Sequence, residues 1–140
     1  MRKFLYLNVL SAYFGFLFFV VVHLAFNVSR ITRLTGWEPE FVMNSVLLFN
    51  LLLIPLIGVV YIFFIAPHFT SLNNLNYISC VSWFVYFIGF SYVFTSLFPI
   101  VNPEDKANKV LGLITIFAAC AYPFYILFII FLARQRGQNK

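Results

Sequence analysis

Charged side chains are scarce in this sequence. Asp, Glu, Lys and Arg make up 9% of the 140 residues, whereas 63% of the residues are hydrophobic and 21% are aromatic. A soluble domain carries about 25% charged residues, and a short chain cannot cover so much apolar surface in water. The scarcity of charge therefore excludes an ordinary soluble domain and indicates that lipid surrounds the chain.

Cysteine is also scarce, and the usual motifs of metal, nucleotide and disulfide sites are missing. The two cysteines, Cys80 and Cys120, lie in apolar runs and form no CxxC pair, so neither a disulfide framework nor a zinc site is predicted. The sequence has no Gly-rich phosphate loop. His23 and His68 are expected on opposite sides of the bilayer, which is too far apart to share a metal or haem. We expect no metal and no cofactor.

All nine basic and four acidic residues lie outside four long apolar stretches, which run from about 4 to 26, 41 to 66, 77 to 101 and 110 to 133. A helix needs about 20 apolar residues to cross the hydrocarbon core, and a backbone in lipid must satisfy its own hydrogen bonds. The pattern predicts an all-α integral membrane protein. Residues 1–140 are expected to form a single transmembrane domain, a four-transmembrane-helix bundle whose first span is retained.

The basic residues, which give a net charge of +5, gather at the ends of the apolar stretches. This arrangement is typical of a membrane protein and argues against a nucleic-acid partner, because it forms no basic patch. Five of the nine basic residues lie near the two termini, and four lie in the first and third loops. The positive-inside rule then favours cytoplasmic termini, in what we expect to be a bacterial inner (plasma) membrane.

The first and third loops carry all four acids, in the segments "WEPEF" and "VNPEDK". Each proline suits the first position of a helix, and Asn102 is a good N-cap. Glu40, Glu104 and Asp105 would then lie where the helix dipole favours negative charge. The alternative is functional: together with Glu38, these acids would form an outer cluster that binds a cation or a basic partner.

Small and polar residues recur at helical spacing in each span, and such residues mark the interfaces between helices in lipid. In the second span, Asn44, Leu51 and Gly58 share a face, and Asn50 is expected to point elsewhere. The residues predicted to pack between helices are Asn8, Ser11, Gly15, Asn44, Gly58, Ser79, Ser82, Gly89, Ser96, Gly112, Thr115 and Ala119.

Pro55 and Pro123 interrupt the second and fourth spans. A proline inside a helix removes one backbone hydrogen bond and can kink the helix. Both are expected to shape the helices. In the functional alternative, each would act as a hinge or free a carbonyl that binds a ligand.

His23 is the one histidine inside an apolar stretch. It lies about twenty residues from the start of the first span, which places it near the far membrane boundary, four residues before Asn27. A structural role is the simplest interpretation, and proton-sensitive or ligand binding is the alternative. His23, Glu38 and Glu40 are the best catalytic candidates, but no catalytic motif joins them, and the spans lack the buried charges of a pump.

In size and topology the chain resembles small bacterial inner-membrane proteins, including those that protect against pore-forming bacteriocins. We therefore favour a protein without catalytic chemistry, an accessory subunit or immunity-type protector that acts by helix–helix association with a membrane-protein partner or a second copy. A small oligomeric transporter or channel for a neutral or apolar solute is the alternative. A membrane enzyme that uses His23 and the outer acids on a lipid substrate is less favoured.

Overall fold

Helices form almost all of the chain in the computed structural model, which describes residues 2–67 and 75–138 and contains no strand in those ranges. His68 lies outside the described residues. The elements are α1 (Arg2–Phe26), α2 (Val28–Thr35), α3 (Pro39–Val60), the π-helix η1 (Tyr61–Ile65), the 3-10 helix η3 (Leu75–Ile78), α4 (Ser79–Leu97), the 3-10 helix η4 (Pro103–Asp105) and α5 (Lys109–Gln138).

Four of these segments are long and apolar enough to cross a membrane: α1, α3 together with η1, α4, and the segment that contains α5. This confirms the predicted all-α fold with four candidate spans. The chain is therefore a small polytopic membrane protein.

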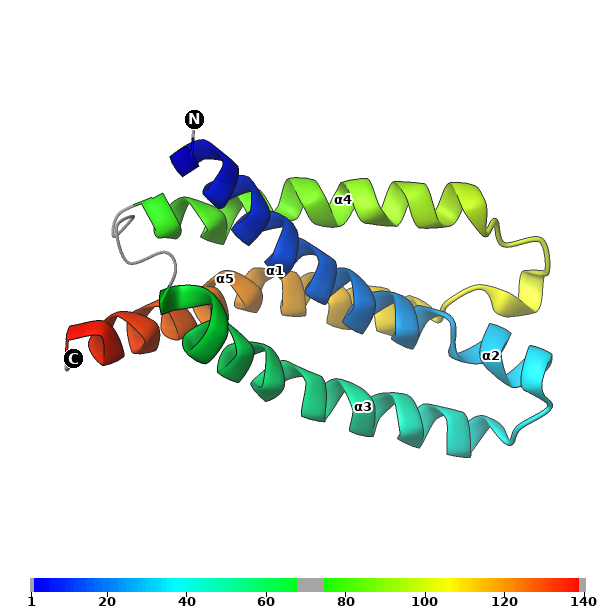
Figure 1. The fold of residues 1–140 in the computed structure, drawn as a ribbon. Helices are drawn as coiled ribbons and strands as arrows, with labels where there is room; N and C mark the ends of the chain where they lie inside the picture. Colours follow the sequence, from blue (N-terminus) through cyan, green and yellow to red (C-terminus); the bar gives the residue numbers. More distant parts are fainter. Residues whose placement is uncertain (1, 68–74, 139–140) are drawn as a thin grey trace.

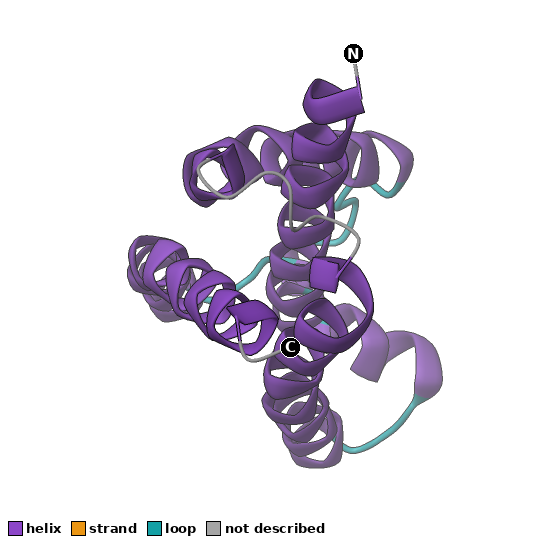
Figure 2. Ribbon diagram, turned by 60° about the vertical axis from the view of Figure 1, so that its left-hand side comes forward, coloured by secondary structure: helices purple, strands orange, loops and turns teal. Residues whose placement is uncertain are grey.

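Helix α1 is the central helix of the bundle. It lies between α4 and α3, and α5 covers it from behind (Figure 1). A view turned by 60° shows the long helices crossing one another at open angles (Figure 2), and α1 makes its most extensive contact with α4. The chain begins and ends at one end of the bundle, which we call the terminal end. Helix α2 and residues 98–108 form the opposite, loop end.

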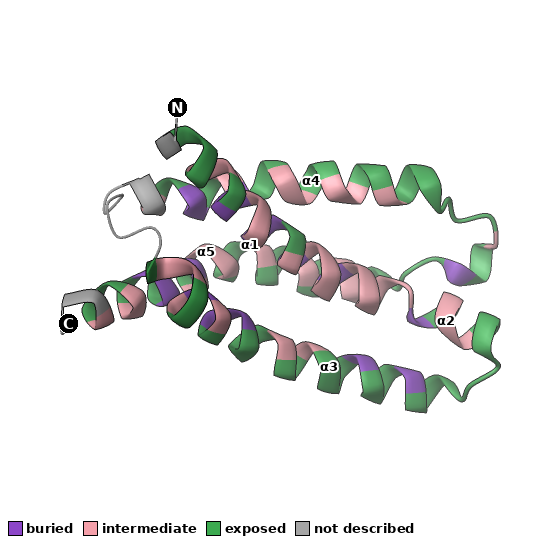
Figure 3. Ribbon diagram, in the orientation of Figure 1, coloured by how far each residue is buried: buried purple, intermediate pink, exposed green. Residues whose placement is uncertain are grey.

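The core is built around one face of α1, on which an apolar side chain recurs every four residues. Leu10, Phe14, Phe18 and Val22 are all at most 5% exposed. They pack against Ile57 and Tyr61 of α3 and η1, Cys80 and Trp83 of α4, and Ile126, Ile129 and Ile130 of α5. The outward faces of the four long helices are mostly exposed (Figure 3). Their apolar side chains suit contact with lipid.

Polar side chains join the helices by donating hydrogen bonds to backbone carbonyls of their neighbours. Such bonds satisfy groups that would otherwise be unpaired in lipid. The bonds are Tyr13 Oη to Ile57 O (3.1 Å), Tyr122 Oη to Phe14 O (2.9 Å), Tyr125 Oη to Ile54 O, and Asn50 Nδ2 to Val21 O (3.1 Å). Asn50 therefore points inward, toward α1. From the sequence, the packing face of this span was expected to be that of Asn44, Leu51 and Gly58, with Asn50 pointing elsewhere.

Helix α2 was expected to be part of a loop. Asn27 separates it from α1, and α2 then buries Val28 against Val42 and Val46 of α3. It ends at Gly36, whose φ of 70° is the left-handed conformation that glycine adopts without strain, and whose N–H donates to Thr32 O at 2.9 Å. Helix α2 has eight residues, five of them with polar side chains, so it is too short and too polar to stand out in a search for spans.

The third loop does not enter its helix as expected. Asn102 does act as an N-cap, because its Oδ1 accepts a hydrogen bond from Glu104 N at 3.1 Å, but it caps η4 and not the fourth span. Helix α5 begins at Lys109, where Asn108 Oδ1 accepts from Val110 N at 3.2 Å. In the first loop, Pro39 is the first residue of α3, as the sequence predicts.

Both prolines of the spans lie inside helices that continue past them, Pro55 in α3 and Pro123 in α5. A proline at either position cannot donate to the carbonyl four residues earlier. Helix α3 passes into the π-helix η1 beginning at Tyr61. A hinge or ligand-binding role for Pro55 and Pro123 stays a prediction.

Candidate functional site

His23 lies in the last turn of α1, at the loop end of the bundle. Its Nε2 is 3.0 Å from Ser91 Oγ of α4, within hydrogen-bond distance. The imidazole is also enclosed by rings, with centroids 4.5 Å from that of Phe19 and 4.8 Å from that of Phe94. The ring therefore helps to hold α1 against α4, and Ser91 is a partner that sequence reasoning missed.

Asn27 contacts the backbone of His23, and the two acids of the first loop lie at the exposed start of α3. Asn27 Nδ2 donates to the His23 carbonyl oxygen at 2.7 Å, so it ties the end of α1 and leaves the imidazole to Ser91. Glu38 is the exposed N-cap of α3, and exposed Glu40 lies in the first turn. Within residues 2–67 and 75–138, no three His, Cys, Asp or Glu side chains are grouped closely enough to hold a metal ion.

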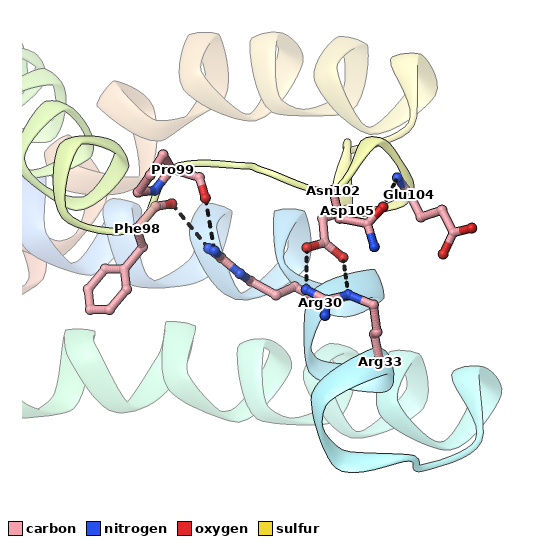
Figure 4. Close-up of polar contacts among 7 residues, drawn as sticks. All are labelled: Arg30, Arg33, Phe98, Pro99, Asn102, Glu104 and Asp105. Carbon is pink, nitrogen blue, oxygen red and sulfur yellow. Dashed lines mark hydrogen bonds and ion pairs between the residues drawn. The ribbon is translucent and has the colours of Figure 1, made fainter.

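The acid of the third loop that the structure buries is Asp105. Arg33 of α2 donates two parallel hydrogen bonds to its carboxylate, Nε to Oδ1 at 3.0 Å and Nη2 to Oδ2 at 2.7 Å (Figure 4). The Asp105 side chain is only 2% exposed. This bond holds the pKa of the Asp105 carboxyl below its ordinary value and raises the pKa of the Arg33 guanidinium. Asp105 is thus a structural anchor for α2.

Glu104 differs from its neighbour because its side chain is exposed, while its backbone N–H is the one that Asn102 caps (Figure 4). The predicted outer cluster of four acids is therefore divided. Asp105 is paired with an arginine, and Glu38, Glu40 and Glu104 remain exposed at the loop end. Cation or basic-partner binding by these three stays a prediction.

Arg30 is the second arginine of α2, and its contacts were not predicted from the sequence. Its Nη1 donates to Phe98 O at 3.1 Å and its Nη2 donates to Pro99 O at 3.0 Å, just beyond the end of α4 (Figure 4). Phe98 is the C-cap of α4 and Pro99 follows it, so α4 supplies no donor for either carbonyl. The spacing of Arg30 and Arg33, one helical turn apart after an apolar span, was the available signal that both face the same neighbour.

A groove of about 510 Å³ runs between the last turn of α1, α2 and the end of α4. We call it the α2 groove. His23, Asn27 and Arg30 supply its polar lining, and the rest is apolar, including Leu24, Phe94 and Phe98. It combines a few polar groups with apolar walls, which is typical of sites that bind small amphiphilic molecules.

Four of the residues predicted to pack between helices, Asn8, Ser11, Gly15 and Ser82, lie where α1 meets α4. Tyr86 Oη donates to Asn8 Oδ1 at 2.5 Å, and the Ser11 and Ser82 hydroxyl oxygens are also 2.5 Å apart. At Gly15 the helices approach so closely that an added Cβ would lie 2.6 Å from Trp83 O and 2.7 Å from Tyr86 Cβ. Small and polar residues thus allow α1 and α4 to touch.

Of the other predicted packing residues, some lie inside the bundle and some outside it. Ser79 is fully buried, Ala119 packs against the core, and an added Cβ at Gly58 would lie 2.6 Å from Ile129 Cδ1. Thr115 Oγ1 donates to Leu111 O of its own helix. Asn44, Gly89 and Ser96 are exposed, Leu51 is 68% exposed, and an added Cβ at Gly89 or Gly112 would have no atom within 4 Å. The second span was expected to pack through the face of Asn44 and Leu51, whereas α3 buries Val42, Val46 and Ile57.

A second cavity, of about 240 Å³, lies among α1, α3 and α5. Its lining is almost entirely apolar and includes Val21, Ile54, Ala118 and Ala121. The hydroxyls of Tyr122 and Tyr125, which also line it, are engaged with backbone carbonyls. The cavity suits an apolar molecule or a lipid chain.

The fold and these sites place the chain among small all-α polytopic membrane proteins with four candidate spans. No protein-family model, curated protein or solved structure matches it.

Proposed function

We propose that this protein acts without catalytic chemistry, by associating through its helices with another membrane protein, as an accessory subunit or an immunity-type protector. The supporting observation is that part of the predicted packing surface lies outside the bundle. Small and polar residues in lipid favour helix contacts, and Gly89 and Ser96 face away from the neighbouring helices of this chain.

The surface proposed for the partner is the outer face of α4, made of Val85, Gly89, Val93 and Ser96. These residues follow each other at steps of three and four and are all exposed. Only 11% of the α4 span is buried within the chain, compared with 33% of the α1 span. The open space around Gly89 would let a partner helix approach closely, as Gly15 lets α4 approach α1.

We place the protein in a bacterial inner (plasma) membrane with both termini in the cytoplasm. The supporting observation is the distribution of charge, with five of nine basic residues near the termini. The first and third loops hold the other four, together with all four acids. Loop charge of this kind sets the orientation of a membrane protein.

A pull-down from the native membrane in mild detergent, with mass spectrometry and the mass of the particle, tests the association. We expect a stoichiometric membrane-protein partner beside the 16.3 kDa chain. Gly89→Leu is expected to abolish partner binding, because the larger side chain prevents a second helix from approaching closely. The variant should still fold, since an added Cβ at Gly89 has no atom of this chain within 4 Å. Cys120→Leu, a similar enlargement at an exposed residue of α5, is the control and retains the partner.

A partner that Gly89→Leu retains would contradict the proposed surface, and a pure monomer would contradict the association itself. The second candidate function, transport of a neutral or apolar solute, is supported by the apolar cavity among α1, α3 and α5. A monomeric or homo-oligomeric particle that carries such a solute across liposome membranes would favour that candidate.

A further inference from the structure

The α2 groove holds a positive charge in apolar surroundings at the boundary of a predicted span. Arg30 is half-buried in the groove wall. Its two hydrogen bonds go to neutral carbonyls, those of Phe98 and Pro99, which fix the guanidinium in place without neutralising it. Among the residues that the structure describes, the one ion pair joins Arg33 to Asp105. Arg30 acts on the Asp105 carboxylate through its charge but forms no ion pair with it.

The polar groups of the groove converge along one side of α1 and α2. His23, Asn27 and Arg30 follow each other at steps of four and three residues, which brings them to the same helical face across the break at Asn27. The guanidinium has five N–H donors, and two of its nitrogens each give one donor to the carbonyls. Further donors remain for an anionic oxygen.

The remaining lining of the groove is apolar and extends from the polar end along α1 and α4. Leu24 and the rings of Phe94 and Phe98 belong to this wall, and the volume of about 510 Å³ lies in the range of small-molecule sites. A free phosphate would leave the wall uncovered. A molecule with an anionic head and a long apolar chain would cover both parts.

We propose that the α2 groove binds an anionic phospholipid, with the lipid phosphate on Arg30, near Asn27 and His23, and one acyl chain along the apolar wall. Charge complementarity and depth select this occupant. An arginine guanidinium binds phosphate oxygens through charge-assisted hydrogen bonds, and the bilayer supplies the lipid at high local concentration. The site is independent of the partner surface on α4, because it lies on the side of α4 that faces α1 and α2.

Native mass spectrometry of the detergent-solubilised protein, titrated with phosphatidylglycerol or phosphatidylcholine of the same acyl chains, tests this proposal. We expect preferential retention of phosphatidylglycerol. Arg30→Gln is expected to weaken its binding about fivefold, the effect of one Arg near an anionic lipid surface, and Arg30→Lys to restore part of it. Arg134→Gln, which removes an equal charge from an exposed residue of the terminal end, should bind as the unaltered protein does.

A second variant tests the groove without touching the hydrogen bonds of Arg30. Leu34 lines the groove and is 70% exposed, so Leu34→Trp can narrow the groove while the core stays intact. It should weaken phosphatidylglycerol binding at an unchanged melting temperature. Equal binding of the two lipids, unchanged binding in both Arg30→Gln and Leu34→Trp, or full displacement by inorganic phosphate would each overturn the proposal.

Discussion

Arg33 and Asp105 are the residues that fasten the loop end of the bundle. One lies in α2 and the other ends the short helix η4, 72 positions later, yet two hydrogen bonds join them. The Asp105 carboxylate is nearly inaccessible to solvent and is the bidentate partner of Arg33. A substitution that removes this carboxylate therefore leaves the Arg33 guanidinium without its acceptor. Removing one member of such a pair usually harms stability more than the pair itself contributes.

The pair predicts a specific dependence of stability on pH. Arg33 lowers the pKa of the Asp105 carboxyl in the folded protein, so the unfolded chain takes up a proton first as the solution is acidified. The stabilisation is complete above the ordinary pKa of aspartate and is lost as the pH falls through the lowered one. We expect the melting temperature in detergent to fall over this acidic range, as followed by circular dichroism.

Asp105→Asn should lower the melting temperature at neutral pH by a few degrees and remove this part of the acid dependence. The matched control is Glu104→Gln, which changes the exposed neighbouring acid and should leave the curve close to that of the unaltered protein. Superimposable curves for Asp105→Asn and the unaltered protein would show that the pair adds nothing to stability.

At the scale of the helices, the contact between α1 and α4 holds the bundle together, and Gly15 sets its distance. Gly15→Ala should destabilise the protein by about 1–3 kcal/mol, the usual cost of overpacking, because the new Cβ would collide with backbone at Trp83 and with Tyr86. Gly89→Ala, the same change on the exposed face of α4, should be neutral or slightly stabilising, since alanine favours helix.

Equilibrium unfolding in mixed micelles, read as the free energy of unfolding of both alanine variants, measures this difference. Equal effects at Gly15 and Gly89 would mean that α1 and α4 are not in close contact at Gly15. A large loss at Gly89 alone would instead show that its face packs against another helix under the conditions of measurement.

The four spans were predictable because lipid leaves a strong and simple pattern, about twenty apolar residues without charge. Helix α2 was not, since its burial depends on Val42 and Val46 of another helix, which no local pattern reveals. For the same reason Asn50 was assigned to the wrong face. Its bond to Val21 O crosses to α1, and four spans with nearly uniform apolar surfaces give weak signals for rotation about the helix axis.

Among the candidate site residues, the sequence indicated the depth of His23 but not its partner Ser91. Likewise it indicated the acids of the third loop but not the buried pairing of Asp105 with Arg33. Both contacts join residues roughly seventy positions apart, and a single sequence carries no record of such distances. What composition reveals is the environment of a residue, whereas its partners follow from how the helices pack.

For the whole molecule, the structure places the start of α1 and the end of α5 at one end and α2 with η4 at the other. If the terminal end is cytoplasmic, single cysteines introduced at the loop end should react with a membrane-impermeant thiol reagent added outside intact cells. Thr35→Cys and Ala107→Cys are suitable because both residues are exposed and neither change alters the charge that sets orientation.

Gln135→Cys, an exposed and uncharged position at the terminal end, is the matched control and should react only after the cells are opened. Cys80 is buried and Cys120 lies within a span, so a variant in which both are replaced by alanine provides the background. Labelling of Gln135→Cys alone in intact cells would show that the terminal end faces outward, the opposite of the proposed orientation. Labelling of only one of Thr35→Cys and Ala107→Cys would contradict four spans, because the two positions must share a side when both α3 and α4 cross the membrane between them.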